Sequence, residues 1–471
     1  WEPNSRKKDS FLVMFTETLP RKESRMLPLP CVAEPLVMSL GIAFSEPTFN
    51  RILPLLVGAI LLRGRRSVTA ILWAMRDWVP GHMTSYHRVL SRASWSLWPL
   101  AKVLARAAIA VAEKYGSGGW ILVAGDDTVA QAKGKRVYGK GCHRDSVRST
   151  HSHTVWRWGH KWVVLAILVP FPFARRPWAL PVLVALYRPR ELNEKEGRRH
   201  KTPIDLARGL LATLLHWFPD KKFVFLGDGA YASHEFACFF HRHRRRAALV
   251  ARFHGDAALY DPPPKYAGRG RPRVKGQKRR SPWAVVADAR LKKIVVDWYG
   301  KSKRTVQICH GTGHWYKRGQ DLVPVRWVFV RDDTGTRRDE YFYTTNPGFT
   351  AATVIHWYTC RWSIETTFQE MRAHLGFETT RGWAPNTVLR TGPCLLGLFS
   401  VVCLIYHEYL KGEKPELCHR PGYQKAEVTF SDAIATVRRL FWAETLFAEP
   451  LAREAVQKLP RKLRQLIFDQ L

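Results

Sequence analysis

The stretch Trp120-Ile-Leu-Val-Ala-Gly-Asp-Asp-Thr128 decides the fold of this chain, because it is a short apolar run that ends in two carboxylates. A second run of the same kind, Lys221–Leu226, is followed by Gly227-Asp228-Gly229. Short apolar runs rich in β-branched and aromatic residues favour buried strands. Acidic residues at the carboxyl ends of such strands are typical of the sites of open α/β sheets. The two runs therefore predict an α/β sheet with Asp127 and Asp228 at the ends of two separate strands.

The segments around these two runs continue the α/β pattern. Lys161–Phe171 and Ala247–Phe253 have the composition of strands, whereas Pro203–Phe218 and Ser233–Arg245 have the periodicity of helices. Thr202 precedes the first of these helices and is positioned to cap it, with a proline in the first turn. Strands that alternate with crossover helices predict an α/β sheet.

The chain after this sheet has a different character. Residues 256–348 begin with prolines and continue in short alternating runs, which predicts a mostly β insertion. Helical periodicity resumes at Thr350 and continues to about Leu375, and residues 380–471 are again helical. Within the insertion, the expected strands are Ala284–Ala287, Lys293–Trp298, Thr305–His310, Val325–Val330 and Glu340–Thr344.

The chain before the sheet is predicted to be helical over about residues 45–114. A Pro80-Gly81 break separates the expected helices Val68–Met75 and Ser85–Ser91, and Thr84 is positioned to cap the second. Two short helices joined by a turn are compatible with a DNA-reading unit, and equally with an ordinary helical bundle. The candidate DNA-binding side chains of the second helix are His87, Arg88 and Arg92.

The composition points to a polyanionic partner. Lys and Arg number 75 against 39 Asp and Glu, which gives a formal net charge of +36, and 46% of the residues are hydrophobic. So large an apolar fraction excludes a disordered tail. An excess of positive charge destabilises a folded chain unless a polyanion neutralises it, so nucleic acid is favoured over an anionic membrane surface or an acidic protein.

Two other classes of protein are disfavoured by the sequence. The longest apolar runs, 52–62 and 394–406, are shorter than the roughly 20 residues of a membrane helix, so no membrane span is expected. The eight cysteines include no CxxC pair and are interpreted as reduced intracellular thiols. Cys309, His310 and His314 lack a partner pair at zinc-site spacing, so a zinc site is not expected either.

Three carboxylates carry the predicted chemistry, namely Asp127, Asp228 and Glu365. Asp126 directly precedes Asp127, which leaves open which member of the doublet is used. Hard divalent ions such as Mg²⁺ and Mn²⁺ prefer oxygen ligands, often a few carboxylates together with substrate phosphate. Three convergent carboxylates can hold two such ions about 4 Å apart, where they activate water at a phosphodiester. We therefore expect two Mg²⁺ or Mn²⁺ ions as cofactors.

The expected helix around Glu365 adds groups that bind phosphate. With about 100° of rotation per residue, Glu365 and three neighbours in the sequence point into one arc of about 60°. A carboxylate between a phenol and two guanidinium groups is suited to hold a metal ion beside phosphate. The alternative is a solvated helix face with an i, i+4 ion pair. The predicted phosphate-binding residues are Tyr358, Arg361 and Arg372.

The segment Tyr358-Thr-Cys-Arg361-Trp-Ser-Ile-Glu365, followed by Arg372, resembles the Y-(2)-R-(3)-E-(6)-K signature of bacterial insertion-sequence DDE transposases. The resemblance extends over about Leu122 to Gly376 and includes the two Asp motifs in the same order. Arg372 stands where that family usually has Lys, which keeps the charge and changes the shape of the contact. The first Asp of the family precedes a Thr, which favours Asp127 over Asp126.

This resemblance implies an RNase H-like catalytic core with a β-strand insertion between Asp228 and Glu365. It also implies metal-dependent nicking at a transposon end, a hairpin formed by attack of the freed 3′-OH, reopening of the hairpin, and joining to target DNA. In this group a Trp of the insertion stacks on a flipped base. The segment Pro324-Val325-Arg326-Trp327 resembles the sequence around that Trp, so Trp327 is the predicted stacking residue, with a buried strand Trp as the alternative.

A strongly basic stretch predicts a further DNA contact. Residues 239–280 contain 13 Lys or Arg against only Asp256 and Asp261. Within them, Arg269-Gly270-Arg271-Pro272-Arg273 resembles an AT-hook core, in which Gly and Pro keep the backbone extended and arginines enter a narrow minor groove. A basic loop that contacts only phosphates is the alternative. Both interpretations predict DNA binding through Arg269, Arg271 and Arg273.

We therefore expect an α/β RNase H-like catalytic core with an inserted mostly-β domain, flanked by all-α N- and C-terminal domains. The expected function is a cut-and-paste DNA transposase that acts as a homodimer on double-stranded DNA in a bacterial cytoplasm or nucleoid, without a membrane. A metal-dependent nuclease or resolvase with the same core and a DNA-binding regulator with an inactive core are the alternatives. The expected segments are 1–115 (helical, DNA-binding), 116–255 (core), 256–348 (β insertion), 349–380 (core, with the Glu helix) and 381–471 (helical, the candidate dimerisation region).

Overall fold

Strands β1 (Ile121–Gln131) and β5 (Phe223–Gly227) pair in parallel, so the two apolar runs of the sequence meet in one sheet. Ile121 pairs with Phe223, and Ala124 pairs with Leu226. Every residue of β5 is buried. Strands of a parallel pair are usually covered on both faces, which is why they have continuous apolar sequences. The pairing also places the carboxylates that follow each run at the same end of the sheet.

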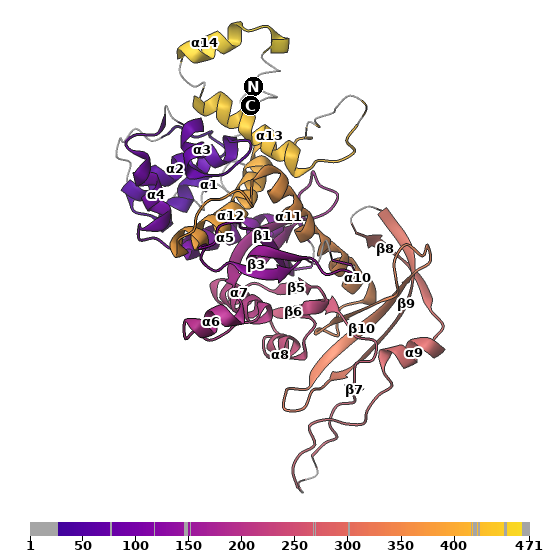
Figure 1. Ribbon diagram of the computed structural model, residues 1–471. Coiled ribbons are helices and arrows are strands. Elements are labelled where there is room, and N and C mark those ends of the chain that lie inside the picture. The colour runs from indigo at the N-terminus through magenta and orange to yellow at the C-terminus, as the bar shows by residue number, and fades with distance from the viewer. Residues whose placement is uncertain are drawn as a thin grey trace. The chain divides into compact units, whose positions relative to one another are not determined.

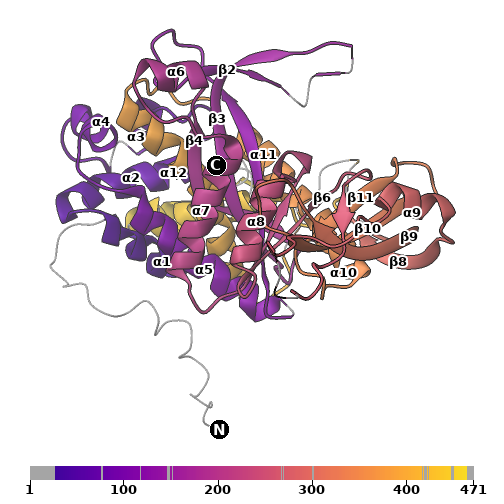
Figure 2. The same cartoon turned by 90° about the horizontal axis from the view of Figure 1, so that it is seen from below.

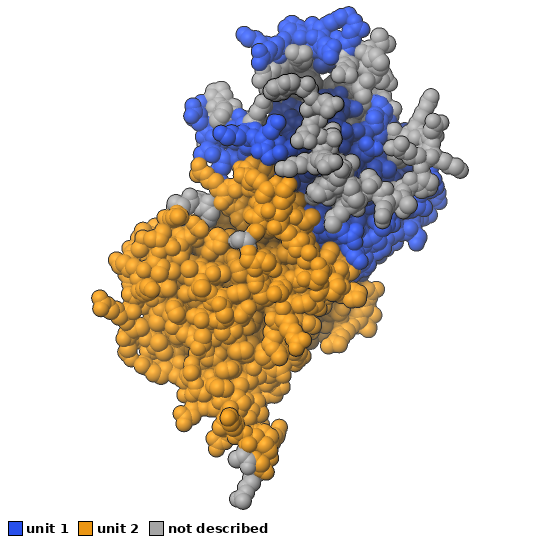
Figure 3. All heavy atoms as spheres, turned by 180° about the vertical axis from the view of Figure 1, so that it is seen from behind, with its two compact units in different colours: residues 1–108, 130–159, 368–471 blue, residues 109–129, 160–367 orange. Residues whose placement is uncertain are grey.

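The structure is a computed structural model that describes residues 27–463 except for 76–77, 117, 146–148, 151, 267, 269, 300–301, 416, 418–421, 423 and 447–449. The chain forms two compact units, which Figure 3 distinguishes by colour. Unit 1 comprises residues 1–108, 130–159 and 368–471, and unit 2 comprises residues 109–129 and 160–367.

Most strands lie in unit 2, where they build one large mixed sheet (Figure 1). The strands besides β1 and β5 are β2 (Gly141–Arg144), β3 (Trp156–Val169), β4 (Trp178–Tyr187), β6 (Ala247–Arg252), β7 (Leu259–Tyr260), β8 (Lys292–Trp298), β9 (Ser302–Trp315), β10 (Val323–Asp332) and β11 (Glu340–Thr344). Among the described residues their order is β2-β3-β1-β5-β6-β11-β10-β9-β7, with β4 paired to β3 and β8 paired to β9. The strands β1, β5 and β6 are parallel to one another, and β8 to β11 are antiparallel.

Two helices of unit 2 have side-chain caps at their N-termini, and the first of these caps is the one that the sequence predicts. Thr202 accepts a hydrogen bond from the backbone N–H of Asp205 and forms a capping box at the start of α7 (Pro203–Trp217). Ser233 caps α8 (His234–Arg242) by accepting a hydrogen bond from Phe236 N. The other helices of this unit are α6 (Arg190–Lys195), η3 (Gly229–Tyr231), α9 (Pro282–Asp288) and α10 (Ala351–Cys360).

The β insertion departs from its sequence prediction at one segment. Strands β8 to β11 occur where four of the five runs predict them, but Ala284–Ala287 lies inside the helix α9 and the strand predicted there is wrong. The physical reason is local, because Ser281 caps this helix by accepting a hydrogen bond from Ala284 N, and Pro282 occupies the first helical position. A capped N-terminus with proline at its first position outweighs the strand propensity of two valines.

The expected helix 350–375 is divided at Arg361 into α10 and α11 (Trp362–His374). The backbone N–H of Arg361 donates to Tyr358 O at 3.1 Å, and Ile364 N donates to Arg361 O at 3.1 Å. These i to i−3 bonds form a turn tighter than an α-helix. The prediction that the phenol, both arginines and Glu365 share one face of a single unbroken helix is therefore wrong.

Unit 1 contains α1 (Glu34–Ser39), η1 (Leu40–Ala43), α2 (Glu46–Leu61), α3 (Val68–Ala74), α4 (Met83–Ser91), α12 (Pro385–Leu410), α13 (Phe430–Phe441), η4 (Trp442–Leu446) and α14 (Pro450–Lys458). The helix α5 (Leu97–Tyr115) begins in unit 1, and its last residues belong to unit 2. α12 packs against α2, α4 and α13, so the apolar run of the C-terminal region lies in a helical core. α4 is capped by His82 and not by the predicted Thr84.

The helix α12 is longer than the apolar run 394–406 from which the sequence excluded a membrane helix. It has 26 residues and is long and apolar enough to cross a membrane by length and composition. However, 72% of its most apolar window is buried within the structure. A helix that is apolar on all sides is expected either in a membrane or in the core of a large protein. The packing of α12 on three other helices accounts for its apolar composition.

Candidate active site

The Asp doublet lies in the middle of β1, just beyond the residues that pair with β5, so the expectation that this strand ends at the doublet is wrong. The two carboxylates have different environments. Asp126 Oδ2 accepts a hydrogen bond from Arg361 Nη1 at 3.1 Å, whereas Asp127 Oδ2 lies 2.5 Å from Lys161 Nζ. Successive side chains of a strand point to opposite faces, which explains why neighbouring carboxylates have different partners. Gly125 precedes them because a Cβ there would lie 2.1 Å from the ring of Phe225. The glycine lets β1 approach β5 closely just before the doublet.

Asp126 lies within electrostatic range of Asp228 and of Asp127. Burial raises the pKa of Asp126, the charge of Arg361 opposes this rise, and the nearby carboxylates of Asp228 and Asp127 add to it, so that the pKa is about 7. A carboxyl group with a raised pKa beside other carboxylates is a frequent property of functional sites. The sequence favours Asp127 by resemblance, and the structure adds Asp126 as the residue coupled to the second strand end.

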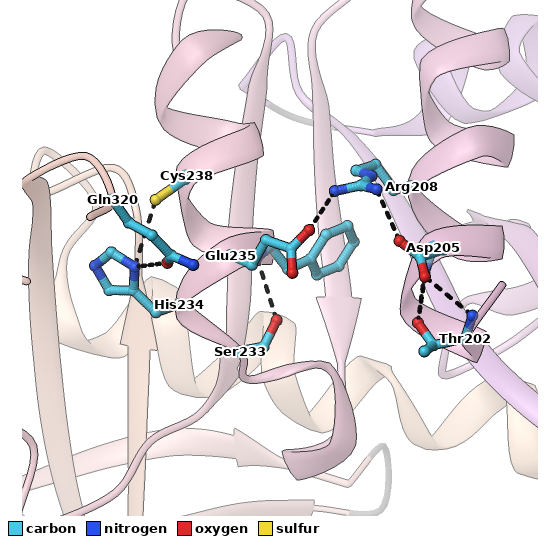
Figure 4. Close-up of polar contacts among 9 residues, drawn as sticks. Thr202, Asp205, Arg208, Ser233, His234, Glu235, Cys238 and Gln320 are labelled. Carbon is cyan, nitrogen blue, oxygen red and sulfur yellow. Dashed lines mark hydrogen bonds and ion pairs between the residues drawn. The ribbon is translucent and has the colours of Figure 1, made fainter. Parts of the chain in front are cut away.

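Asp228 lies in the turn that follows β5. Its Oδ1 accepts a hydrogen bond from Ala230 N at 2.9 Å, and the side chain caps the short helix η3. The chain then enters α8, whose first turn is held by several polar contacts (Figure 4). His234 Nε2 bonds Trp315 O at 3.0 Å, and Arg208 of α7 binds Glu235 at 2.7 Å. These contacts hold the first turn of α8, which follows Asp228 and η3 in the chain.

Arg361 connects the doublet to Glu365. Its Nη2 donates to Glu365 Oε1 at 2.6 Å, while its Nη1 binds Asp126. The Arg361 side chain is 11% exposed, and the Glu365 side chain is 32% exposed. Burial lowers the pKa of Arg361, but the adjacent Asp126, Tyr358 and Glu365 outweigh that effect and raise it. The guanidinium therefore stays charged and binds two candidate metal-binding carboxylates, those of Asp126 and Glu365.

Two buried polar atoms at this site lack a hydrogen-bond partner among the described residues. They are the hydroxyl of Tyr231 and Nε of Arg361. Tyr231 is 1% exposed, and burial followed by the charges of Asp127, Asp126 and Asp228 raises its pKa well above the ordinary value. Buried polar groups are almost always hydrogen-bonded, so unsatisfied atoms beside carboxylates indicate a place for water, an ion or a phosphate oxygen.

Tyr358 occupies a different position from the one predicted. Its side chain is 2% exposed, and its ring packs 4.2 Å from the ring of Phe342, measured between centroids. Burial raises the pKa of Tyr358, and Arg361 and Arg252 oppose this rise. The structure therefore places this phenol in the core beside the site and does not support direct phosphate binding by Tyr358.

Arg372, a predicted phosphate-binding residue, contacts a carboxylate in the structure. Its Nε binds Glu378 Oε1 at 3.0 Å, and Arg157 approaches the same carboxylate oxygen at 3.4 Å. All three side chains belong to unit 1. A guanidinium bound to a carboxylate must exchange that partner to bind phosphate, so the phosphate role of Arg372 stays a prediction.

Trp327 does not lie where a base could reach it. The residue pairs with Gly311 and Tyr343 of the neighbouring strands and is 3% exposed. Its indole ring covers Gly311, where a Cβ would lie 2.9 Å from the ring. The buried strand Trp, which the sequence left as the alternative, is what the structure contains, and the stacking role predicted for Trp327 is not supported.

The sequence did not identify three charged side chains near these carboxylates. Lys161 neutralises Asp127, and Arg252 pairs with Glu340, which is 13% exposed. Arg252 ends β6 and Glu340 begins β11, which pairs with β6, so the sheet itself brings them together. The only sequence signal for Arg252 and Glu340 was their position at strand ends, and there was none for Lys161.

A cavity of about 250 Å³ lies beside the first turn of α11. Tyr299, one of the residues that line it, has φ of 49°, in the left-handed region that a tyrosine rarely adopts. Arg337 stacks 3.6 Å from the centroid of the Tyr299 ring. The lining residues are Arg175, Arg176, Pro177, Asp297, Trp298, Tyr299, Lys303, His356, Thr359, Cys360, Trp362 and Ser363.

The predicted DNA-binding side chains are exposed where the structure describes them. His87 and Arg88 of α4, Arg92 after it, and Arg271 and Arg273 of the basic loop are all exposed, and Arg269 lies outside the described residues. Exposed cations are available to phosphate, but exposure alone does not identify a DNA contact. These roles stay predictions.

The donor atoms of the site are those that a hard divalent cation prefers, but their present positions do not form a metal-binding group. Asp126, Asp127, Asp228 and Glu365 supply only oxygen donors, which Mg²⁺ and Mn²⁺ prefer. Among the described residues, no group of three or more His, Cys, Asp or Glu side chains is arranged to hold a metal ion. Arg361 and Lys161 instead neutralise three of the carboxylates.

The fold and the site together define an α/β protein with acidic residues on or directly after two parallel strands. The chain belongs to the DDE superfamily endonuclease family, whose model matches residues 40–305, more than half of the sequence. The matched range contains Asp126, Asp127 and Asp228 and ends before Glu365. Family membership makes endonuclease chemistry the class of activity for this chain.

No curated protein matches the chain. Among solved structures, it is similar to the piggyBac transposase synaptic complex with hairpin DNA, with 10% sequence identity and a TM-score of 0.42. The alignment covers 92% of this chain and 80% of that chain. A likeness this low assigns no residue role and no activity to the present protein.

Proposed function

We propose that this protein is a metal-dependent DNA transposase that cleaves at transposon ends and transfers the freed strand into target DNA. The observation that carries the proposal is that Asp126 of β1 lies close enough to Asp127 and Asp228 for their charges to raise its pKa. Arg361 binds Asp126 and Glu365 at the same time. The family of the chain supports phosphodiester cleavage. The net charge of +36 supports a polyanionic substrate.

Asp228, Glu365 and one member of the Asp doublet would hold the divalent ions, two Mg²⁺ or Mn²⁺. Bound there, such ions supply activation of water and stabilisation of the leaving oxygen. Arg361 orients Glu365 and Asp126 through its two terminal nitrogens, and its charge can be shared with a DNA phosphate. Lys161 holds Asp127 in place and neutralises it until the substrate is bound.

The finer features of the proposal rest on the resemblance to insertion-sequence transposases. They are an RNase H-like core, a Y-R-E signature with Arg372 in the last place, hairpin intermediates, a homodimer on DNA and a bacterial origin. Double-stranded DNA, both transposon ends and target, is the proposed partner. The exposed cations of α4 and of the basic loop are the proposed contacts to its backbone.

Strand transfer is the activity that tests the proposal. The full chain is incubated with a pre-cleaved transposon end carrying a free 3′-OH, target plasmid and Mg²⁺ or Mn²⁺. A joined product that disappears with EDTA and with Asp228→Asn is the expected result. The DNA ends are taken from terminal inverted repeats found beside the coding region. If these ends are cleaved and no joined product forms, the result contradicts transposition.

A metal-dependent endonuclease without strand transfer is the second candidate, and the family itself favours it. The same experiment separates the two, because an endonuclease cuts the end and leaves the target unchanged. A DNA-binding regulator with an inactive core is the third candidate. It is excluded if wild type cleaves transposon-end DNA and Asp228→Asn does not.

A further inference from the structure

Strand β2 and the first residues of β3 form a two-stranded antiparallel ribbon within unit 1 (Figure 2). Cys142 pairs with Trp158, and Arg144 pairs with Trp156. These four side chains share one face of the ribbon because side chains alternate along a strand. That face is open to solvent, since Trp156 is 64% exposed and Trp158 is 57% exposed.

The opposite face of the ribbon is anchored. His143 is 6% exposed, and Arg157, its cross-strand neighbour, binds Glu378 at 3.4 Å. The exposure of the two indoles therefore does not come from a ribbon that lacks support. Trp158 is contacted by Lys140, whose Nζ lies 5.2 Å from a ring centroid. In the described part of the chain, no ring contact joins Trp156 to Trp158.

Cations surround the exposed indoles. Residues 130–159 contain seven Lys or Arg and one acid, Asp145, which is 9% exposed. Exposed indoles on a surface rich in cations and poor in accessible acids match a polyanion that also offers flat aromatic rings. The exposed cations with no hydrogen bond or ion pair among the described residues are Lys133, Lys135, Arg136 and Arg144.

We propose that this ribbon binds DNA and that Trp156 and Trp158 receive one unpaired base between their rings. Residues i and i+2 of an antiparallel strand are roughly 6.8 Å apart. Stacked bases are spaced by about 3.4 Å along a strand, so two indoles at that separation leave room for one base in contact with both. The inference rests on the proposed function, because transposition exposes unpaired bases at the DNA ends.

A second copy of the chain is the principal other occupant of such a face. Two identical surfaces with this excess of positive charge repel each other, whereas DNA phosphates neutralise them. A duplex offers its phosphates but not the faces of its stacked bases. The ribbon is therefore expected to prefer DNA with an unpaired nucleotide to a perfect duplex.

The test compares two fluorescein-labelled DNAs, a perfect duplex and the same duplex with one unpaired thymine. Binding of the full-length chain is followed by anisotropy for wild type, Trp156→Ala/Trp158→Ala and Trp283→Ala. Trp283 is the matched control, since it is 67% exposed but lies on α9 in unit 2. Base stacking on aromatic side chains is strong enough that the double variant should lose about 5- to 100-fold in affinity for the bulged DNA.

The affinity for the perfect duplex should change by less than about 3-fold in the double variant, and its salt dependence should be unchanged, because stacking releases no counterions. The single variant Trp158→Phe, which keeps an aromatic ring at this position, should retain part of the preference for bulged DNA that the double alanine variant loses. By contrast, Lys133→Gln/Lys135→Gln should weaken both DNAs equally and lower the salt slope by about 2. Circular dichroism and thermal melting confirm that each variant is folded.

Three outcomes overturn the inference. One is a double variant that keeps the preference for bulged DNA, and another is a wild type that binds duplex without that preference. The third is a double variant that changes oligomeric state in size-exclusion chromatography while its DNA binding is unchanged, because the indoles would then join two copies. Strand transfer by the same preparations tests the proposed function separately, so either idea can fail alone.

Discussion

Asp126 in unit 2 and Asp432 in unit 1 are both shielded from solvent, with side chains 15% and 1% exposed. Their environments nevertheless shift the pKa of the carboxyl group in opposite directions. Burial and two neighbouring carboxylates raise the pKa of Asp126 to about 7. Burial also acts to raise the pKa of Asp432, but hydrogen bonds from Lys425 and Thr429 outweigh it and lower that pKa below its ordinary value. Asp432, which receives hydrogen bonds from Lys425 and Thr429, is therefore the carboxyl group that ionises more easily.

The difference shows how a structural carboxylate is distinguished from a functional one. Asp432 completes a capping box with Thr429 at the start of α13 and binds Lys425 Nζ at 2.7 Å. Asp126 is crowded with like charges and has Arg361 as its main counter-charge. Concentrated negative charge that its surroundings only partly neutralise is suited to bind a cation, whereas a fully satisfied carboxylate only stabilises the fold.

Asp228→Asn should have the largest effect and sharpen the comparison. Loss of an outer-shell partner at a metal site costs about 10- to 100-fold in activity, so loss of a ligand should lower cleavage of transposon-end DNA by more than about 100-fold. The melting temperature should stay the same or rise, because one of the crowded charges is removed. A variant that melts earlier and cleaves normally would contradict the assignment.

The two members of the doublet provide the next test. If Asp126 is the metal ligand, Asp126→Asn should lose more than about 100-fold in cleavage, and Asp127→Asn should lose no more than about 10-fold. The reverse order supports Asp127, as the resemblance predicts. Isothermal titration with Mn²⁺ on both variants checks that the loss reflects metal binding.

Arg361→Ala tests whether the counter-charge acts on phosphate. Cleavage should fall by about 10- to 100-fold, and Mn²⁺ affinity should fall less, because the carboxylates remain. Arg361→Lys keeps the charge and should recover part of the activity. Equal losses of cleavage and metal affinity in Arg361→Ala would show that the residue only positions the carboxylates.

Asp432→Asn should show the opposite pattern to Asp228→Asn. It removes the charge that binds Lys425 and weakens the cap of α13, at a cost of about 2 kcal/mol in the free energy of unfolding. Activity per folded molecule should not change. Urea denaturation measures the first quantity and cleavage at low temperature the second, and a loss of activity without a loss of stability would remove the contrast.

The smallest expected effect is the dependence of Asp432 on pH. The pKa of this group is lower in the folded chain than its ordinary value of 3.8, so the unfolded chain takes up the proton first as the pH falls. Its contribution is fully present above the unfolded pKa and is lost as the pH falls through the folded pKa. Urea midpoints of wild type and Asp432→Asn should therefore converge at acidic pH, and a constant difference would contradict the lowered pKa.

Much of the strand framework followed from residue patterns. The parallel pair β1 and β5, the strands β8 to β11 and the cap of α7 occur where the sequence predicts them. The helix α9 did not, because a serine cap and a proline outweighed two valines. The break at Arg361 was also missed, because no glycine or proline marks the tight turn there.

For the candidate site, the sequence supplied Asp228, Glu365, Arg361 and the doublet as separate residues. It could not predict that Tyr358 and Trp327 are buried, because aromatic side chains occur both in protein cores and as stacking groups on the surface. It also gave no sign of Lys161, whose position depends on the pairing of β3 with β1.

The sequence by itself determined the charge of +36, the apolar runs that become strands and the carboxylates at their ends. Those properties depend on composition and local order along the chain. Only the tertiary structure decided which carboxylate of the doublet binds Arg361 and which binds Lys161. A strand directs neighbouring side chains to opposite faces, and what each face meets is set by packing among segments that are distant in the sequence.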